Sequence, residues 1–168
     1  MRAGGKHPPM GDGKDENESE RLDRELIELL NELRVALPGV QVLFAFLLTI
    51  PFTGRFGQLS EVQRDVYFGT FLATIAATAF LMTPTAFHRL RWRRYDKERM
   101  LQVGNRTAIL GLSCLAISIC GAAYLIADVL FGTGGAAATL VAAAALIGGL
   151  WFVLPLTRQI KDDEPDPV

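Results

Sequence analysis

Asp128 is the residue of this chain that most invites a chemical role, because it is the one charged residue between Thr107 and Thr157. An isolated acid in an apolar stretch is a functional candidate, since a charge is costly to bury in hydrocarbon. Asp128 also stands close to a glycine-rich segment, where it would be a loop residue that caps the following helix. Both interpretations stay open.

Three threonines recur at every fourth position: Thr70, Thr74 and Thr78. Residues four apart share one helix face, so their hydroxyls form a polar seam. Such a seam can line a path for water or an ion. Alternatively, each hydroxyl donates to the carbonyl four residues before it and packs against a neighbouring helix.

The other reactive residues form no recognisable site. Cys114 and Cys120 are six residues apart, about 120° around one helix, which prevents a disulfide between them. His7 and His88 lack a matching set of ligands, and the glycine-rich segment 132–135 lacks the spacing of a nucleotide-binding loop. The sequence therefore predicts no catalytic residue, no metal, no cofactor and no enzymatic activity.

The distribution of charged residues along the chain indicates which segments form the helices that carry Asp128 and the threonines. The chain has 168 residues, of which 50% are hydrophobic, and a net charge of -1. This balance argues against nucleic-acid partners, because nucleic-acid-binding domains carry a basic excess. Apart from Asp128, the charged residues lie in segments 1–34, 55–65, 88–106 and 158–168. Such a distribution excludes an ordinary soluble globule.

Four apolar segments separate these charged regions, and each is long enough to cross a bilayer. A hydrocarbon core about 30 Å thick needs about 20 residues of helix. We expect an all-α membrane protein, a bundle of four transmembrane helices preceded by a cytoplasmic amphipathic helix. The spans are predicted at about 37–54, 63–87, 105–127 and 134–157. Ser60 and Gln63 match a capping box that would begin the second span, and Asp96 is a candidate cap for the third.

Lysine and arginine fall unequally on the two sides of the predicted membrane, with 15 in one set of alternate connections and 2 in the other. Because basic loops stay in the cytoplasm, both termini and loop 88–106 are expected there. Basic side chains are attracted to anionic lipids. The loop therefore carries candidate headgroup contacts, or else only a topology signal with ordinary interface anchors, at Arg89, Arg91, Trp92, Arg93 and Arg94.

Residues 18–36 predict an amphipathic helix between a disordered segment 1–17 and the first span, and the tail 158–168 is also expected to be disordered. Asn17 and Glu20 match a capping box, and Pro38 should kink the chain before the span. An acidic face favours a protein partner, or the chain's own basic loop, over a membrane surface. The candidate partner contacts are Leu22, Leu26, Leu29, Leu33, Glu25, Glu28 and Glu32.

Small residues dominate the last predicted span. Gly134, Ala138 and Ala142 recur at four-residue spacing, and the pairs Ala144–Gly148 and Ala145–Gly149 repeat it. Small residues at this spacing let helix backbones approach closely. They serve either packing within the chain or a homo-oligomer contact.

The segments ERLDRELIELLNELRVA (residues 20–36) and GVQVLFAFLLTIPF (residues 39–52) resemble an uncharacterised family of small four-span integral membrane proteins of high-GC Gram-positive bacteria. Arg55-Phe56 and the segment 86–89 are also similar to that family. The resemblance covers about residues 20–157 and implies a bacterial inner membrane as the location. Some members of the family carry a cation/proton antiporter label.

Together these observations predict a non-enzymatic structural or interaction component of the membrane, which acts through its cytoplasmic helix on an unknown protein partner. The alternative is a small cation- or proton-coupled transporter, similar to a sodium:proton antiporter, or an oligomeric ion pathway.

Overall fold

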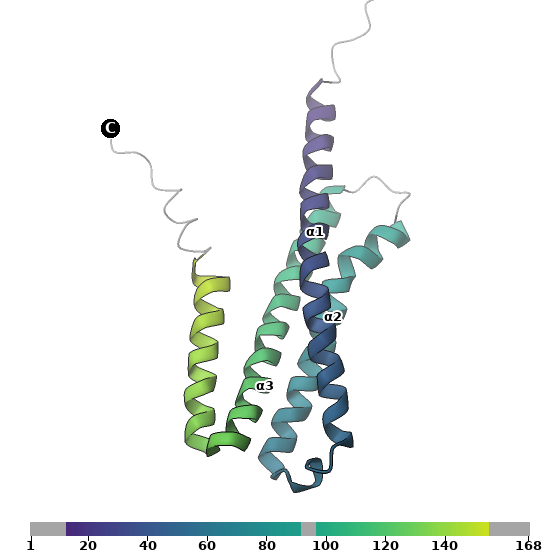
Figure 1. Ribbon diagram of the computed structural model, residues 1–168. Helices are drawn as coiled ribbons and strands as arrows, with labels where there is room; N and C mark the ends of the chain where they lie inside the picture. The colour runs from purple at the N-terminus through teal and green to yellow at the C-terminus, as the bar shows by residue number, and fades with distance from the viewer. Residues whose placement is uncertain (1–12, 92–96, 155–168) are drawn as a thin grey trace, which may run out of the picture.

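The computed structural model describes residues 13–91 and 97–154, which form three long helices (Figure 1). These are α1 (Gly13–Thr49), α2 (Glu61–Arg91) and α3 (Lys97–Gly148), and a π-helical turn, η3 (Gly149–Val153), extends α3. Two 3₁₀ turns, η1 (Ile50–Phe52) and η2 (Phe56–Gln58), join α1 to α2. Each long helix contains a stretch long and apolar enough to cross a membrane. The prediction of an all-helical chain is confirmed for the described residues.

Helix α3 turns back on itself at Gly132. This residue has φ 73° and ψ -177°, a conformation that glycine adopts without steric cost because it lacks a Cβ atom. Figure 1 shows the two limbs of α3, residues 97–131 and 133–148, running in opposite directions. The third and fourth spans predicted from the sequence therefore both belong to α3, which reverses direction at Gly132. We call the end of the molecule that holds this turn and residues 50–60 the loop end.

Helix α1 is longer than the sequence analysis predicted at its start and continuous where a kink was expected. It begins at Gly13, so Asn17 lies inside it and the predicted capping box with Glu20 is wrong. It also continues through Pro38 to Thr49. A proline removes one backbone donor and normally ends or bends a helix. Here α1 packs against its neighbours on both sides of Pro38, which compensates for the lost hydrogen bond.

The packing face of α1 repeats every seven residues through Leu26, Leu33, Val40 and Leu47. The last three are buried, with 4%, 0% and 1% of their surface exposed. Leu33 and Val40 join Ala77, Leu81 and Leu115 of α2 and α3 in the core cluster. A seven-residue apolar repeat is the pattern by which long helices pack side by side. One seam thus runs along the predicted amphipathic helix and the predicted first span together.

Helix α2 lies closest to the first limb of α3, at glycine positions. A Cβ atom added at Gly111 would stand 2.6 Å from Cγ and 3.2 Å from the backbone nitrogen of Leu81. No side chain fits at that distance, so glycine is what permits the approach of the two backbones. Leu81 itself is fully buried.

The start of α2 has the cap that its sequence predicts. The backbone N–H of Gln63 donates to Ser60 Oγ over 3.2 Å, and the backbone N–H of Ser60 donates to Gln63 Oε1 over 3.0 Å. This reciprocal pair satisfies two donors that the helix cannot satisfy internally. The capping box of Ser60 and Gln63 is confirmed.

Candidate functional site

The threonine seam of α2 faces the first limb of α3. Thr70 and Thr74 have 3% and 0% of their surface exposed. Thr70 Oγ1 donates to the carbonyl of Val66 over 2.7 Å, Thr74 to that of Thr70 over 2.8 Å, and Thr78 to that of Thr74 over 2.9 Å. The interpretation of this stripe as carbonyl-bonded packing is confirmed. Each hydroxyl proton is used within its own helix.

Ser118 of α3 completes the polar contact between the two helices. Its hydroxyl, which is fully buried, donates to the Cys114 carbonyl over 2.9 Å and reaches the Thr70 carbonyl at 3.4 Å. Three residues further along α3, a Cβ atom added at Gly121 would collide with Thr70 Oγ1. The sequence analysis missed both residues. The signal that could have found Ser118 is its seven-residue spacing from Gly111.

Asp128 lies in the first limb of α3, four residues before the turn at Gly132. It is half-buried, and its Oδ2 accepts a hydrogen bond of 2.7 Å from Nε2 of Gln63. The expectation that Asp128 caps the last helix is therefore wrong, because its partner belongs to α2. Gln63 bonds Ser60 through its oxygen and Asp128 through its nitrogen, so one amide both caps α2 and ties it to α3.

A tyrosine that the sequence analysis did not select joins α2 to the end of α1. Tyr67 is buried, and its hydroxyl donates to the Leu47 carbonyl over 2.8 Å. Its ring stacks on Phe71 at 6.4 Å and meets Phe56 edge-on at 5.4 Å. A buried tyrosine needs such a partner for its hydroxyl. The loop end is thereby held together by a backbone carbonyl of α1 and side chains of η2 and α2.

Two of the four leucines predicted as partner contacts, Leu29 and Leu33, pack against the chain's own helices. Leu33 is buried in the core cluster, and Leu29 packs against it. Leu29 also lies beside Gly104, where an added Cβ atom would meet both of its methyl groups at 3.7 Å. Leu22 and Leu26 are half-buried. This apolar seam is therefore occupied along part of its length by α2 and α3.

The acids predicted alongside those leucines border the seam, and Glu25 lines a hollow together with Leu29 and residues 101, 102 and 105 of α3. Glu28 and Glu32 are exposed, and half-buried Glu25 forms an ion pair of 2.9 Å with Arg21. Exposed ion pairs of this kind contribute little stability. We call Glu25, Glu28 and Glu32 the acidic face. Its exposed members, Glu28 and Glu32, lie on the polar side of the amphipathic helix that the sequence analysis predicted.

The predicted headgroup contacts fall at the edge of the described chain. Arg89 and Arg91 belong to the last turn of α2, while Trp92, Arg93 and Arg94 lie outside the described residues. Helix α3 begins at Lys97, and the candidate cap Asp96 also lies outside the described residues. The interaction of this segment with lipid headgroups stays a prediction.

The small residues of the last limb do not produce close packing within the chain. Ala138, Ala142 and Ala145 are exposed, and a Cβ atom added at Gly134 or Gly149 would meet no atom within 4 Å. Gly111 and Gly121 in the first limb stand in contrast, because they contact α2 directly. Ala144 and Gly148 of the same stripe face α2 and the first limb across a hollow, so packing within the chain and a homo-oligomer contact both stay predictions.

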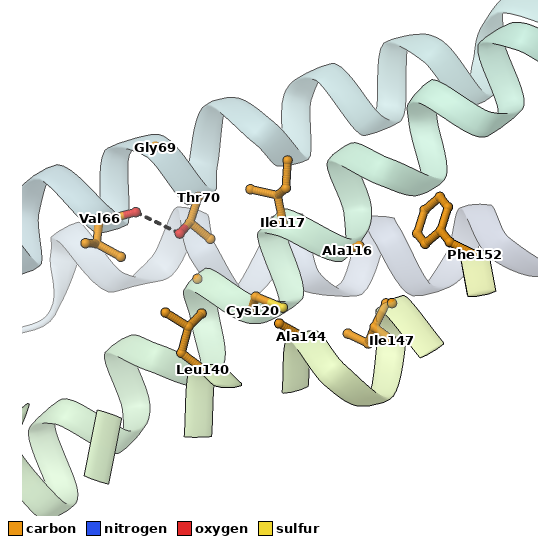
Figure 2. A pocket seen from close by; sticks show the side chains of 12 residues that line it. Val66, Gly69, Thr70, Ala116, Ile117, Cys120, Leu140, Ala144, Ile147 and Phe152 are labelled. Atoms are coloured by element: carbon orange, nitrogen blue, oxygen red, sulfur yellow. Dashed lines mark hydrogen bonds between the residues drawn. The ribbon is translucent and has the colours of Figure 1, made fainter. Parts of the chain in front are cut away.

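A cavity of about 520 Å³ lies between α2 and the two limbs of α3 (Figure 2). Its walls are apolar side chains such as Ile117, Leu140 and Ile147, and its polar lining is limited to Thr70 and Cys120. Cys120 and Cys114 are both free thiols and half-buried. Among residues 13–91 and 97–154, no group of three His, Cys, Asp or Glu is placed to hold a metal ion.

Comparison with known proteins assigns the whole helical region to one family. A family of unknown function (DUF6328) matches residues 15–155. No curated protein and no solved structure matches the chain. The match extends from the first turn of α1 to the end of η3, and so includes every contact described above.

The contact of Gly121 with Thr70 predicts a non-additive pair of substitutions. Gly121→Ala should destabilise the protein by about 1–3 kcal/mol, because the new methyl group overlaps the threonine hydroxyl. Thr70→Ala should have a smaller effect alone, and the double variant should recover part of the loss, because the overlapping oxygen is gone. Thermal unfolding in detergent, followed by circular dichroism, measures these differences.

Gly134→Ala is the matched control, since its added methyl group meets no neighbour. Unfolding midpoints that are equal for Gly121→Ala and Gly134→Ala, or losses that simply add in the double variant, would contradict this packing.

Proposed function

We propose a function for this chain from the premise that it belongs to DUF6328, a family of unknown function. The chain is a bacterial inner-membrane protein that crosses the bilayer four times, with both termini in the cytoplasm. It is not an enzyme. It acts as an interaction component that presents the acidic face of α1 to a basic segment of a protein partner.

Two features support four crossings. The second part of α3 together with η3, residues 133–153, is about 30 Å long at 1.5 Å per residue, which matches the hydrocarbon core. The turn at Gly132 reverses the chain between this part and the first limb. The orientation is supported by the 15 basic residues on the side of the termini, against 2 on the other.

The observation that carries the interaction role is the continuity of α1. This helix runs from Gly13 to Thr49 without interruption, and its seam is anchored on α2 and α3 through Leu33, Val40 and Leu47. The acidic face is thereby held outward in a fixed direction. Among the described residues, neither Glu28 nor Glu32 takes part in a hydrogen bond or an ion pair. A basic partner segment would neutralise both carboxylates.

Transport is the alternative, and the half-buried Asp128 is the observation that favours it. The pathway would have to rely on this one acid, since Thr107 to Thr157 contains no other charged residue. Proton relays are normally built from chains of ionisable groups at membrane depth. The threonine hydroxyls already donate to helix carbonyls. These points favour the interaction role.

The proposed orientation predicts a pattern of thiol accessibility. In a background with Cys114→Ala and Cys120→Ala, a membrane-impermeant maleimide should modify Gly57→Cys in intact cells. In the proposed orientation α1 begins on the cytoplasmic side, so Glu28→Cys should react only after the membrane is permeabilised. The reverse pattern would refute the orientation.

The interaction role predicts charge-dependent capture of a partner. A photoreactive residue at the exposed position Arg24 should crosslink to a protein, or to the chain's own residues 88–95. Exchanging Glu28 and Glu32 for lysine should reduce that capture about tenfold, because like charges then repel. Mass spectrometry of the crosslinked products identifies what is captured.

The matched control places the photoreactive residue at Val42, which is 72% exposed and lies within the apolar stretch of α1. It should capture lipid alone in both charge states. The proposal fails if Arg24 also captures lipid alone, or if the lysine exchanges and deletion of residues 1–19 leave its capture unchanged.

A further inference from the structure

We infer that a hollow at the loop end binds one phospholipid, whose phosphate group contacts Arg55 and whose acyl chain lies on the apolar lining. This hollow lies between the end of α1, the turns η1 and η2, α2 and the first limb of α3, and it shares no residue with the cavity beside the last limb. The inference rests on the proposed membrane crossing but is independent of the interaction role of α1.

Two aromatic side chains that line this hollow are fixed by contacts within the chain. The hydroxyl of buried Tyr67 donates to the Leu47 carbonyl over 2.8 Å, and the ring of Phe56 meets the Tyr67 ring edge-on at 5.4 Å. The turn η2, which carries Phe56, is tied to α2 because Arg64 Nη2 donates to the Gly57 carbonyl over 3.2 Å. The apolar wall is therefore in place before any ligand binds.

Arg55 adds a positive charge to this apolar wall. Among the described residues that line the hollow it is the charged one, and it directly precedes Phe56 in the chain. Its side chain is exposed and, within residues 13–91 and 97–154, makes no hydrogen bond or ion pair, whereas Arg64 is bonded. A guanidinium group binds phosphate oxygens through several N–H groups at once. A cation beside a hydrocarbon surface is the complement of a phospholipid.

Arg55 also lies at the depth where a phospholipid carries its phosphate. The exposed charged residues Glu61 and Asp65 at the start of α2 mark the level at which the chain leaves the hydrocarbon. From this level the apolar lining continues along α3 from Leu130 back to Leu125, about 7.5 Å at 1.5 Å per residue. A lipid with its phosphate at Arg55 would therefore direct its acyl chain along the first limb.

Charge favours a phospholipid over a helix of a second copy. An apolar helix that covered Arg55 would remove water from the guanidinium without supplying a counter-charge, which is costly. The last limb, which carries the candidate homo-oligomer contact, has no acidic residue between positions 132 and 153. A phospholipid supplies the negative charge and the hydrocarbon in one molecule.

The test compares two lipids that differ in the phosphate. The full chain, stripped of lipid in mild detergent, is titrated with phosphatidylglycerol or with diacylglycerol of the same acyl chains, and the complexes are weighed by native mass spectrometry. The wild-type protein should bind one phosphatidylglycerol per chain, about tenfold more tightly than diacylglycerol, because charge-assisted hydrogen bonds to the phosphate are added.

Arg55→Gln should lower the affinity for phosphatidylglycerol about tenfold and leave the affinity for diacylglycerol unchanged. A purely structural effect of the substitution would change both affinities. Arg55→Lys, which keeps the charge, should retain most of the preference. The matched control Arg24→Gln removes an exposed arginine at the opposite end of α1 and should behave as wild type.

A second pair of variants tests the apolar part of the hollow. Val129 lines it and is 50% exposed, so Val129→Trp should lower the affinity for both lipids about tenfold by occupying the space of the acyl chain. Val141→Trp, at a position 68% exposed in the last limb, should not. If Val129→Trp loses its helical circular dichroism, Ile126→Trp takes its place.

Equal affinity of the wild-type protein for the two lipids, or an Arg55→Gln variant that keeps the preference, overturns the inference. So does a dimer of chains that excludes phosphatidylglycerol and that Val129→Trp dissociates, which would indicate a second copy in the hollow. Flotation with vesicles of phosphatidylethanolamine and phosphatidylglycerol tests the membrane crossing separately. A chain that floats with the vesicles but shows no preference for phosphatidylglycerol overturns this inference alone.

Discussion

Gly111 and Gly121 let the first limb of α3 come very close to α2. Leu81 and Thr70 of α2 occupy the space that a side chain at either glycine position would need. Between lipid-exposed helices, packing and hydrogen bonds must replace the hydrophobic effect, so close approach of the backbones is the main source of cohesion. The other contacts are built on this pair. Leu33 and Val40 of α1 pack over it, and Gln63 joins its two helices at the loop end through Asp128.

The same constraint divides the molecule into two surfaces with different chemistry. The polar groups between α2 and α3, those of Thr70, Thr74 and Ser118, are bonded to carbonyls of these helices. Glu28 and Glu32 of the acidic face are exposed, and the last limb leaves an apolar cavity beside the core. The exposed carboxylates and the apolar cavity thus lie on different parts of the molecule.

Two features that depend on neighbouring residues in the sequence were predictable, whereas the equally local capping box of Asn17 and Glu20 was wrong because α1 begins before it. The threonine spacing predicted the hydrogen bonds from these hydroxyls to backbone carbonyls of α2, and Ser60 with Gln63 predicted its N-terminal cap. Both patterns act within a few residues. Features that depend on contacts between helices were not. Pro38 predicts a kink from local sterics, but packing on α2 and α3 holds α1 continuous. The partner of Asp128 lies 65 residues away, and the spacing of small residues does not reveal which of them meet a neighbouring helix.

The continuity of α1 is the central claim, and the distance between two spin labels on this helix tests it most directly. Labels are attached at Glu28→Cys and Thr49→Cys, two exposed positions on either side of Pro38, in a background without the native cysteines. A continuous helix places them about 32 Å apart with a narrow distribution, at 1.5 Å per residue. A broad distribution, or a clearly shorter mean distance, would show a hinge at Pro38 and would contradict the fixed orientation of the acidic face.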